Sequence, residues 1–320
     1  MTEGNSSDLQ PGWTERRAIS AIKQRCEEAF GQGAAGEVWI GDDAAVLVGS
    51  GPTVVSVDVV VDGVHADRRL TTTADLGWRA LAAAVSDLAA MGASPTGAVL
   101  GVVASISEDL DALYQGLVAS GLEHGCPIVG GDLVAGDQLT ISVTVLGRPG
   151  PAGPILRSGA QPGDVLFVTG PLGGAAAGLR FLRAGYGRHP ADLEVAAAVE
   201  RHARPRARLS EGMAAASLGV HAMVDVSDGL SIDLDRMAEA SGVGIALETV
   251  PCALRATEDE ALGGGDDYEL LLATPDPLGL LEGFAAAGFT TPTQIGEVSD
   301  VVGQRTLRGG ALPLRGFTYG

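Results

Sequence analysis

Short runs of β-branched residues alternate along the chain with longer segments of helical periodicity. The run TVVSVDVVVD at residues 53–62 predicts a strand, because its valines alternate with polar residues and successive side chains of a strand point to opposite faces. Segment 75–91 predicts a helix that ends at Gly92. The same criteria predict the other elements of the first half, which are helices over 13–30 and 108–124 and strands over 97–104 and 138–147.

The second half continues this mixture of strands and helices. DVLFVTG at 164–170 and YELLLAT at 268–274 predict strands, and the strand-and-turn segment HAMVDVSDG lies between them. Segment 228–241 predicts an amphipathic helix, because its apolar residues recur at helical spacing and a glycine follows as the stop. The glycine-rich TGPLGGAAAGL does not match the dinucleotide-binding pattern and predicts a closely packed helix start.

The segment richest in Pro and Gly, residues 147–163, predicts a domain boundary. We therefore expect a flexible tail over 1–12, an N-terminal domain over 13–150 and a C-terminal domain over 151–320. Neither half has the regular strand–helix rhythm of a doubly wound sheet, so the predicted class is α+β, with two mixed α/β domains of similar size.

The composition of the chain excludes several classes of function. The chain of 320 residues carries 21 Lys and Arg against 40 Asp and Glu, a formal net charge of −19. This balance argues against a nucleic-acid partner and against an anionic membrane surface. Lys23 is the only lysine, so the chain has no P-loop. Three widely spaced cysteines, no signal-peptide pattern and no apolar run of about 20 residues predict a cytoplasmic protein.

Aspartates in glycine-rich or apolar settings are the main chemical signal. One Asp beside Gly usually forms a turn or a helix cap, but a buried set needs cations. Oxygen ligands without Cys or clustered His favour Mg²⁺, Mn²⁺ or Ca²⁺ over zinc. Asp87 shares a helix face with Leu76, eleven residues earlier, because a helix turns about 100° per residue. These aspartates are Asp42, Asp43, Asp58, Asp87, Asp132, Asp225, Asp228, Asp266 and Asp267.

Seven motifs in this order resemble the thiamine-monophosphate kinase family, a branch of the ATP-using superfamily that includes aminoimidazole ribonucleotide synthetase. They are GDDAAVL, SVDVVVDGVH, SDLAAMGA, GGD, LRSGAQPGD, VSDGL and GGDDYEL. The resemblance covers about residues 15–320. It implies an enzyme that phosphorylates thiamine phosphate to thiamine diphosphate with ATP as co-substrate, by direct in-line transfer assisted by several Mg²⁺ ions. It also implies a homodimer in which the N-terminal halves pair their sheets.

The resemblance assigns roles to residues. It places the metal ions at Asp43, Ser56, Asp58, Asp87, Asp132, Asp225 and Asp228. It places ATP at Tyr114, Gly131, Asp132, Arg157 and Ser227, and thiamine phosphate at His65, Asp266 and Phe317. Many relatives have Glu at the position of Asp266, and Val57 offers only its backbone next to the metal. Arg157 supplies positive charge in the transition state. No general base is required, because the attacking phosphate oxygen is largely ionised at pH 7.

Two alternatives remain open. A synthetase of the same superfamily, for aminoimidazole ribonucleotide or for selenophosphate, would share the aspartate motifs. A protein that binds metal or nucleotide without catalysis could also keep the fold. Measuring ATP hydrolysis with and without thiamine phosphate separates all three.

Overall fold

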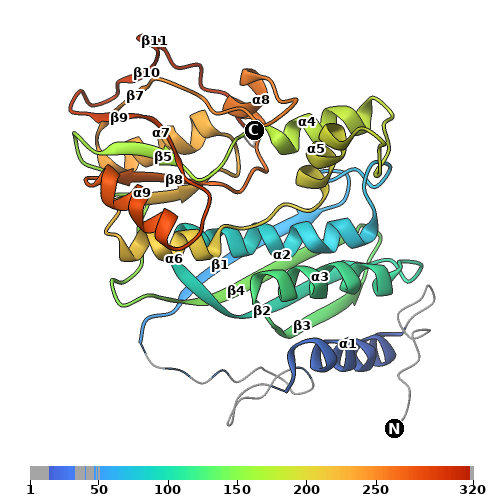
Figure 1. The fold of residues 1–320 in the computed structure, drawn as a ribbon. Helices are drawn as coiled ribbons and strands as arrows, with labels where there is room; N and C mark the ends of the chain where they lie inside the picture. The colour runs from blue at the N-terminus through green and yellow to red at the C-terminus, as the bar shows by residue number, and fades with distance from the viewer. Residues whose placement is uncertain (1–13, 33–39, 41–46, 48, 50, 318–320) are drawn as a thin grey trace. The chain divides into compact units, whose positions relative to one another are not determined.

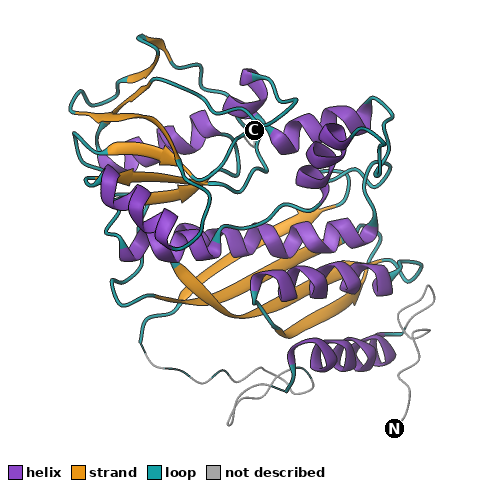
Figure 2. Ribbon diagram, viewed as in Figure 1, coloured by secondary structure: helices purple, strands orange, loops and turns teal. Residues whose placement is uncertain are grey.

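The computed structural model describes residues 14–32, 40, 47, 49 and 51–317. The chain divides into two compact units, one made of Met1–Val85 with Pro95–Arg148 and the other of Ser86–Ser94 with Pro149–Gly320. Each unit mixes helices with a sheet (Figure 2), which confirms the predicted α+β class. No helix in the described part of the chain is long and apolar enough to span a bilayer.

The first unit is built on a four-stranded sheet in the order β1-β4-β2-β3, with β1 antiparallel to β4 and β2 parallel to β3. Helices α2 and α3 lie side by side on one face of this sheet (Figure 1). The elements are α1 (Glu15–Phe30), β1 (Val54–Val61), α2 (Thr73–Ala90), β2 (Ala93–Ala104), α3 (Leu110–His124), β3 (Ile128–Ala135) and β4 (Thr140–Pro149). The end of α2 and the start of β2 belong to the second unit.

Two glycines allow α2 and α3 to touch through their backbones. A Cβ atom on Gly77 of α2 would lie 2.2 Å from the carbonyl oxygen of Leu113, and one on Gly116 of α3 would lie 1.8 Å from that of Ala74. Any larger residue would force the helices apart, so these glycines fix the spacing of the pair that covers the sheet.

Strand β3 is an element that the sequence does not predict. Its glycine pair resembles a turn, yet Gly131 lies inside the strand opposite Leu100 of β2. A Cβ atom on Gly131 would lie 2.4 Å from the carbonyl oxygen of Leu100. The glycine therefore serves a close approach of two strands, and Asp132 projects from a strand rather than from a loop.

The second unit contains a seven-stranded sheet in the order β11-β10-β7-β9-β5-β8-β6. Its strands are β5 (Val165–Val168), β6 (Ala222–Asp225), β7 (Gly244–Leu247), β8 (Leu270–Thr274), β9 (Thr293–Ser299), β10 (Arg305–Leu307) and β11 (Gly310–Ala311). Its helices, besides the end of α2, are α4 (Gly174–Arg183), α5 (Leu193–Ala203), α6 (Leu209–Ser217), α7 (Leu230–Ser241), α8 (Glu258–Gly263) and α9 (Pro277–Ala286).

Helix α7 supplies much of the core of this unit and confirms the helix predicted at 228–241. Leu230, Leu234 and Met237 are fully buried and pack with residues of the sheet. Gly242 ends the helix in the left-handed conformation, with φ of 67°. The loop before α7 therefore stands on a rigid element, and that loop carries the predicted VSDG residues.

Candidate active site

The end of α2 is tied to the end of β6. The buried hydroxyl of Ser86 donates a hydrogen bond of 2.7 Å to Oδ2 of Asp225. Asp87, the next residue of α2, and Asp225 are both half-buried. The structure thus brings the ends of two predicted metal-binding segments together within the second unit.

Asp233 shapes the loop that follows Asp225. Its Oδ2 accepts hydrogen bonds from the amides of Ser227, Asp228 and Gly229, at 3.1, 3.0 and 3.1 Å. Asp233 is 4 % exposed, and its burial raises its pKa, while the amide bonds act in the opposite direction. The sequence analysis missed Asp233. The available signal was an Asp in the first turn of the helix after VSDG, placed to accept from preceding amides.

Two further segments are bonded to the same loop. The amide of Asp266 donates to the carbonyl of Ser227 at 2.7 Å, and the amide of Tyr268 donates to that of Val226 at 2.9 Å. The amide of Phe317 donates to the carbonyl of Asp228 at 3.0 Å. Ser227, Asp228, Asp266 and Phe317, which the resemblance assigns to metal, nucleotide and substrate, therefore lie on adjoining segments of one unit.

Asp266 lies in a tightly folded turn. Asp266 and Tyr268 both have left-handed backbones, with φ of 59° and 51°. The Tyr268 hydroxyl donates to Oδ1 of Asp266 at 3.1 Å. Gly265, directly before Asp266, also has a positive φ, and a Cβ atom there would lie 2.8 Å from the carbonyl oxygen of Ser227. The side chain of Asp266 is thus held by its own turn.

Asp267 binds the start of helix α4. Its carboxylate accepts from the amides of Gly173 at 2.5 Å and Ala175 at 3.3 Å. Although part of its surface stays accessible, Asp267 is surrounded by protein, and the loss of water raises its pKa to about 7. Because a carboxylate of the chain itself binds the amides of this glycine-rich segment, TGPLGGAAAGL is a packed helix start, as predicted.

The structure does not bring Arg157 into contact with this loop. The carbonyl of Arg157 accepts from the hydroxyl of Ser241, at 3.5 Å, at the end of α7. Asp228 lies before the other end of this 12-residue helix, which is about 18 Å long at 1.5 Å per residue. The side chain of Arg157 is exposed and forms no ion pair with any residue that the structure describes.

In the first unit the predicted metal-binding residues lie on both faces of the sheet. Ser56 and Asp58 of β1 pair with the fully buried Val145 and Val143, so they point to the face that α2 and α3 cover. Asp132 pairs with Gly101 of β2, so both residues face the same side of the sheet. A Cβ atom on Gly101 would lie 3.6 Å from the Cβ atom of Ser142, and Ser142 pairs with the exposed Val59. Asp132 therefore points to the open face, away from Ser56 and Asp58.

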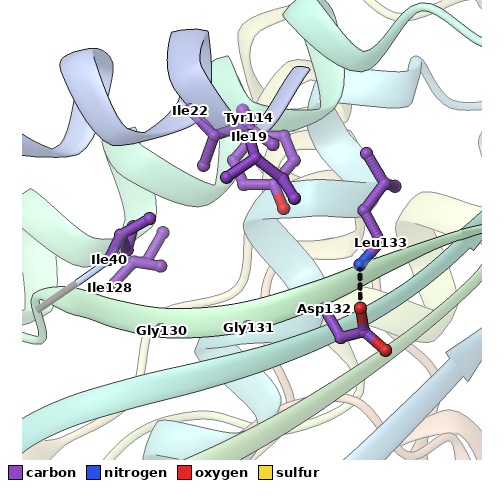
Figure 3. A pocket seen from close by; sticks show the side chains of 9 residues that line it. All are labelled: Ile19, Ile22, Ile40, Tyr114, Ile128, Gly130, Gly131, Asp132 and Leu133. Carbon is purple, nitrogen blue, oxygen red and sulfur yellow. Dashed lines mark hydrogen bonds between the residues drawn. The ribbon is translucent and has the colours of Figure 1, made fainter. Parts of the chain in front are cut away.

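Three predicted ATP-binding residues line one small pocket in the first unit (Figure 3). Tyr114, Gly131 and Asp132 share it with Leu133 and isoleucines from α1 and β3. Burial raises the pKa of the Tyr114 phenol, which is 4 % exposed. Figure 3 shows that the Asp132 carboxylate points to the other side of β3 from Tyr114 and accepts from the Leu133 amide, at 2.9 Å. The two polar groups therefore do not converge on one ligand within this unit.

His65 is held in a loop after β1. Its Nδ1 accepts from the amide of Val61 at 3.0 Å, so the other ring nitrogen carries the proton when the ring is neutral. Arg68 of the same loop donates twice to Glu108, at 2.8 and 2.7 Å. Glu108 is 7 % exposed, so this bidentate pair is a firm anchor for the loop that presents His65.

Asp43, with Asp42 beside it, lies outside the described residues. In the part of the chain that the structure describes, no three His, Cys, Asp or Glu side chains form a group that could hold a metal ion. The predicted ligands that are described lie as separate pairs and single residues. All offer oxygen donors, the ligand type that Mg²⁺ prefers.

Family models and sequences of known proteins match most of the chain. The family described as AIR synthase related protein, N-terminal domain, matches residues 41–148, and that described as AIR synthase related protein, C-terminal domain, matches residues 161–306. A thiamine-monophosphate kinase from Methanopyrus kandleri is 36 % identical over 307 residues, which are 92 % of each chain. The chain belongs to the thiamine-monophosphate kinase family.

Solved structures of this family have the same fold. The thiamine-monophosphate kinase from Stenotrophomonas maltophilia superimposes with a TM-score of 0.82 at 32 % identity and covers 92 % of this chain and 97 % of its own. A complex of AaThiL with AMPPCP and TMP has a TM-score of 0.73 at 25 % identity, covering 93 % and 95 % of the two chains. The family resemblance derived from the seven motifs is confirmed.

Proposed function

We propose that this chain transfers the γ-phosphoryl group of ATP to thiamine monophosphate and releases thiamine diphosphate and ADP. The observation that carries the proposal is the bonding of the Ser227–Asp228 loop to the segments of Asp266 and Phe317. Three segments that are distant in the sequence, each with a residue to which the resemblance assigns a role, are held together by backbone hydrogen bonds. A relative that has been solved with AMPPCP and TMP supports the same pair of ligands here.

The chemistry requires alignment and countercharge more than proton transfer. A phosphate oxygen of thiamine monophosphate is the nucleophile, and it is largely ionised at pH 7 because the second pKa of a phosphate monoester is about 6. It attacks the γ-phosphorus in line, the bond to the β,γ-bridging oxygen breaks, and ADP leaves. Arg157 supplies positive charge to the transition state, and its exposed side chain, which forms no ion pair among the described residues, is available to do so.

Magnesium ions would be held by Asp43, Ser56, Asp58, Asp87, Asp132, Asp225 and Asp228. When bound, they supply charge neutralisation between the two phosphorylated substrates. The donor chemistry fits, because every member offers oxygen. Asp225 and Asp228 stand on either side of one short loop, and Ser56 and Asp58 share one face of β1, whereas Asp132 lies on the opposite face of that sheet. Tyr114, Gly131, Asp132, Arg157 and Ser227 would contact ATP. His65, Asp266 and Phe317 would contact thiamine monophosphate.

The open face of the first sheet supports a homodimer. Val55, Val57 and Val59 of β1 are 59 %, 59 % and 45 % exposed, and Val134 of β3 is 50 % exposed on the same face. Apolar patches of this kind mark protein interaction sites. We propose that two chains pair these sheets.

The free thiols of Cys26, Cys126 and Cys252 suit a reducing compartment, so we place the protein in the cytoplasm.

Mass spectrometry of the products tests the proposal. With ATP, Mg²⁺ and thiamine monophosphate, we expect equal amounts of ADP and thiamine diphosphate, and no ADP above background when thiamine monophosphate is left out. Release of ADP with inorganic phosphate on another acceptor would favour a synthetase of the superfamily. Nucleotide binding without turnover would favour the non-catalytic alternative.

A further inference from the structure

One arginine nitrogen bridges two carboxylates at the start of α7. Nη1 of Arg236 donates to Oδ1 of Asp233 at 2.8 Å and also contacts Oδ2 of Asp228. The Arg236 side chain is 38 % exposed and that of Asp228 is 28 % exposed, whereas that of Asp233 is 5 % exposed. The guanidinium thus connects a buried carboxylate to one that solvent reaches.

The two carboxylates differ in what else they do. Asp233 uses its other oxygen to bind three successive amides of the loop, so it cannot move without breaking that loop. Asp228 is the proposed metal ligand, and its side chain lies at the exposed end of the bridge. Arg236 therefore has a permanent anchor on Asp233 and a second contact that it can give up while it keeps the first.

We propose that Arg236 is a built-in counter-cation, which pairs with Asp228 until a divalent cation takes that carboxylate. This inference rests on the proposed function, because that function makes Asp228 a metal ligand. In the metal-free protein, Arg236 neutralises a carboxylate in a chain of net charge −19 and keeps the loop ordered. When metal binds, Asp228 exchanges one positive partner for another, and Arg236 remains on Asp233.

The physical argument is one of competition. A cation that binds a carboxylate already paired with an arginine must first replace that pair, so the free energy of the pair is subtracted from the metal affinity. Half-exposed ion pairs are weak, and replacing one changes an affinity by about two- to fivefold. Arg236 thus lowers metal affinity by a small, measurable factor. An arginine that instead contacted the nucleotide phosphates would raise the affinity of the metal–nucleotide complex.

Titration of the full chain with Mn²⁺, followed by the EPR signal of the free ion, tests this without measuring turnover. We expect Arg236→Gln to bind Mn²⁺ about two- to fivefold more tightly than the parent. The matched control is Arg305→Gln. Arg305 donates to Asp235 of the same helix at 2.7 Å, so the control removes the same charge nearby and leaves Asp228 untouched. Its Mn²⁺ affinity should equal that of the parent.

Asp228→Asn separates the two ways in which the idea can fail. If Asp228→Asn binds Mn²⁺ as the parent does, the proposed metal role of Asp228 is wrong. If Asp228→Asn weakens binding but Arg236→Gln leaves it unchanged or weakens it, the counter-cation inference is overturned. If Arg305→Gln binds Mn²⁺ more tightly by the same factor as Arg236→Gln, the inference is also overturned, because the loss of any nearby positive charge would then explain the effect.

A second variant keeps the test available if Arg236→Gln does not fold. Arg236→Lys retains a positive charge but loses the planar fork of donors that holds a carboxylate firmly. It should bind Mn²⁺ more tightly than the parent by a smaller factor than that expected for Arg236→Gln. If Arg236→Gln does not fold and Arg236→Lys binds Mn²⁺ as tightly as the parent or more weakly, the inference is contradicted.

Discussion

The hydroxyl of Ser86 and the carboxylate of Asp225 are joined by a hydrogen bond of 2.7 Å, although 138 residues separate them along the chain, from position 87 to position 224. Ser86 is fully buried at the end of α2, and Asp225 ends β6. One oxygen of Asp225 is therefore held in place by the helix that carries Asp87. The bond fixes the direction in which Asp225 presents its other oxygen.

Ser86→Ala tests this positioning. Loss of the donor should lower the free energy of unfolding by about 1 kcal/mol, the usual net value of one hydrogen bond. It should also raise several-fold the Mg²⁺ concentration that gives half-maximal transfer, because Asp225 is no longer oriented. The control is Ser120→Ala. Ser120 is equally buried in α3 and lies 3.3 Å from Nδ1 of His124, so its variant should lose stability without a change in Mg²⁺ requirement.

Metal removal should abolish transfer and leave the fold intact. In the first unit the sheet is held by the packing of α2 and α3, and in the second unit the core around α7 is apolar, so neither requires a cation. After treatment with EDTA and dialysis, we expect no thiamine diphosphate and an unchanged circular dichroism spectrum. Addition of Mg²⁺ should restore activity. Full turnover in EDTA would rule out the metal-assisted mechanism.

Arg157→Ala should slow transfer by about 10²-fold or more, the scale of losing a charged partner of the transition state. Stability should not change, because the side chain is exposed and has no ion pair among the described residues. The control is Arg183→Ala, which removes an exposed arginine at the end of α4. If both variants turn over at the parent rate, Arg157 belongs only to the segment that joins the domains.

Helices and strands with a regular hydrophobic pattern could be predicted from the sequence. In α7 the spacing of Leu230, Leu234 and Met237 determines the buried face, and in β1 the alternation of valines with Ser56 and Asp58 determines two faces. Strand β3 could not be predicted in this way. Of the two glycines that resemble a turn, Gly131 is required by the close approach of Leu100, which is distant in the sequence.

Of the candidate site, only the residues that lie in recognisable sequence motifs could be predicted. Asp225, Ser227, Asp228, Asp266 and Phe317 stand in recognisable patterns, and the structure bonds their segments together. The face to which Asp132 points depends on the register of β3 against β2, which includes a shift after Ala98. The position of Asp233 in the first turn of a helix is a local signal for binding the preceding amides, but the contact of Arg236 with both Asp233 and Asp228 depends on how the loop folds back on the helix.

If two chains pair as proposed, Val57→Asp should yield a monomer. Val57 is 59 % exposed in the middle of β1, so a carboxylate there would be buried without a partner if two sheets pair. Size-exclusion chromatography with light scattering should give twice the chain mass for the parent and the chain mass for the variant. Val302→Asp, at a position 72 % exposed in the second unit, should remain dimeric. A monomeric parent contradicts the proposed pairing.

The pH dependence of stability should show the titration of Asp267. Folding raises its pKa from 3.8 to about 7, so the folded state holds this proton more tightly than the unfolded state does. The stability that this proton contributes to the folded state is therefore fully present below pH 4 and is lost as the pH rises through about 7. Asp267→Asn has no such proton, and its melting temperature should fall less than that of the parent between pH 5 and pH 8.

The comparison requires a variant with the same chemical change at another helix start. Asp276 caps α9 by accepting from the amide of Gly279 at 3.0 Å. Asp276→Asn should change the melting temperature little and equally at every pH, because the Asn side chain still offers an oxygen to the Gly279 amide and the change removes no buried charge. The difference between parent and Asp267→Asn should thus grow or change sign with pH, while that for Asp276→Asn stays constant. If the parent and Asp267→Asn melt in parallel from pH 5 to pH 8, Asp267 is already ionised throughout that range and α4 starts on a permanent carboxylate.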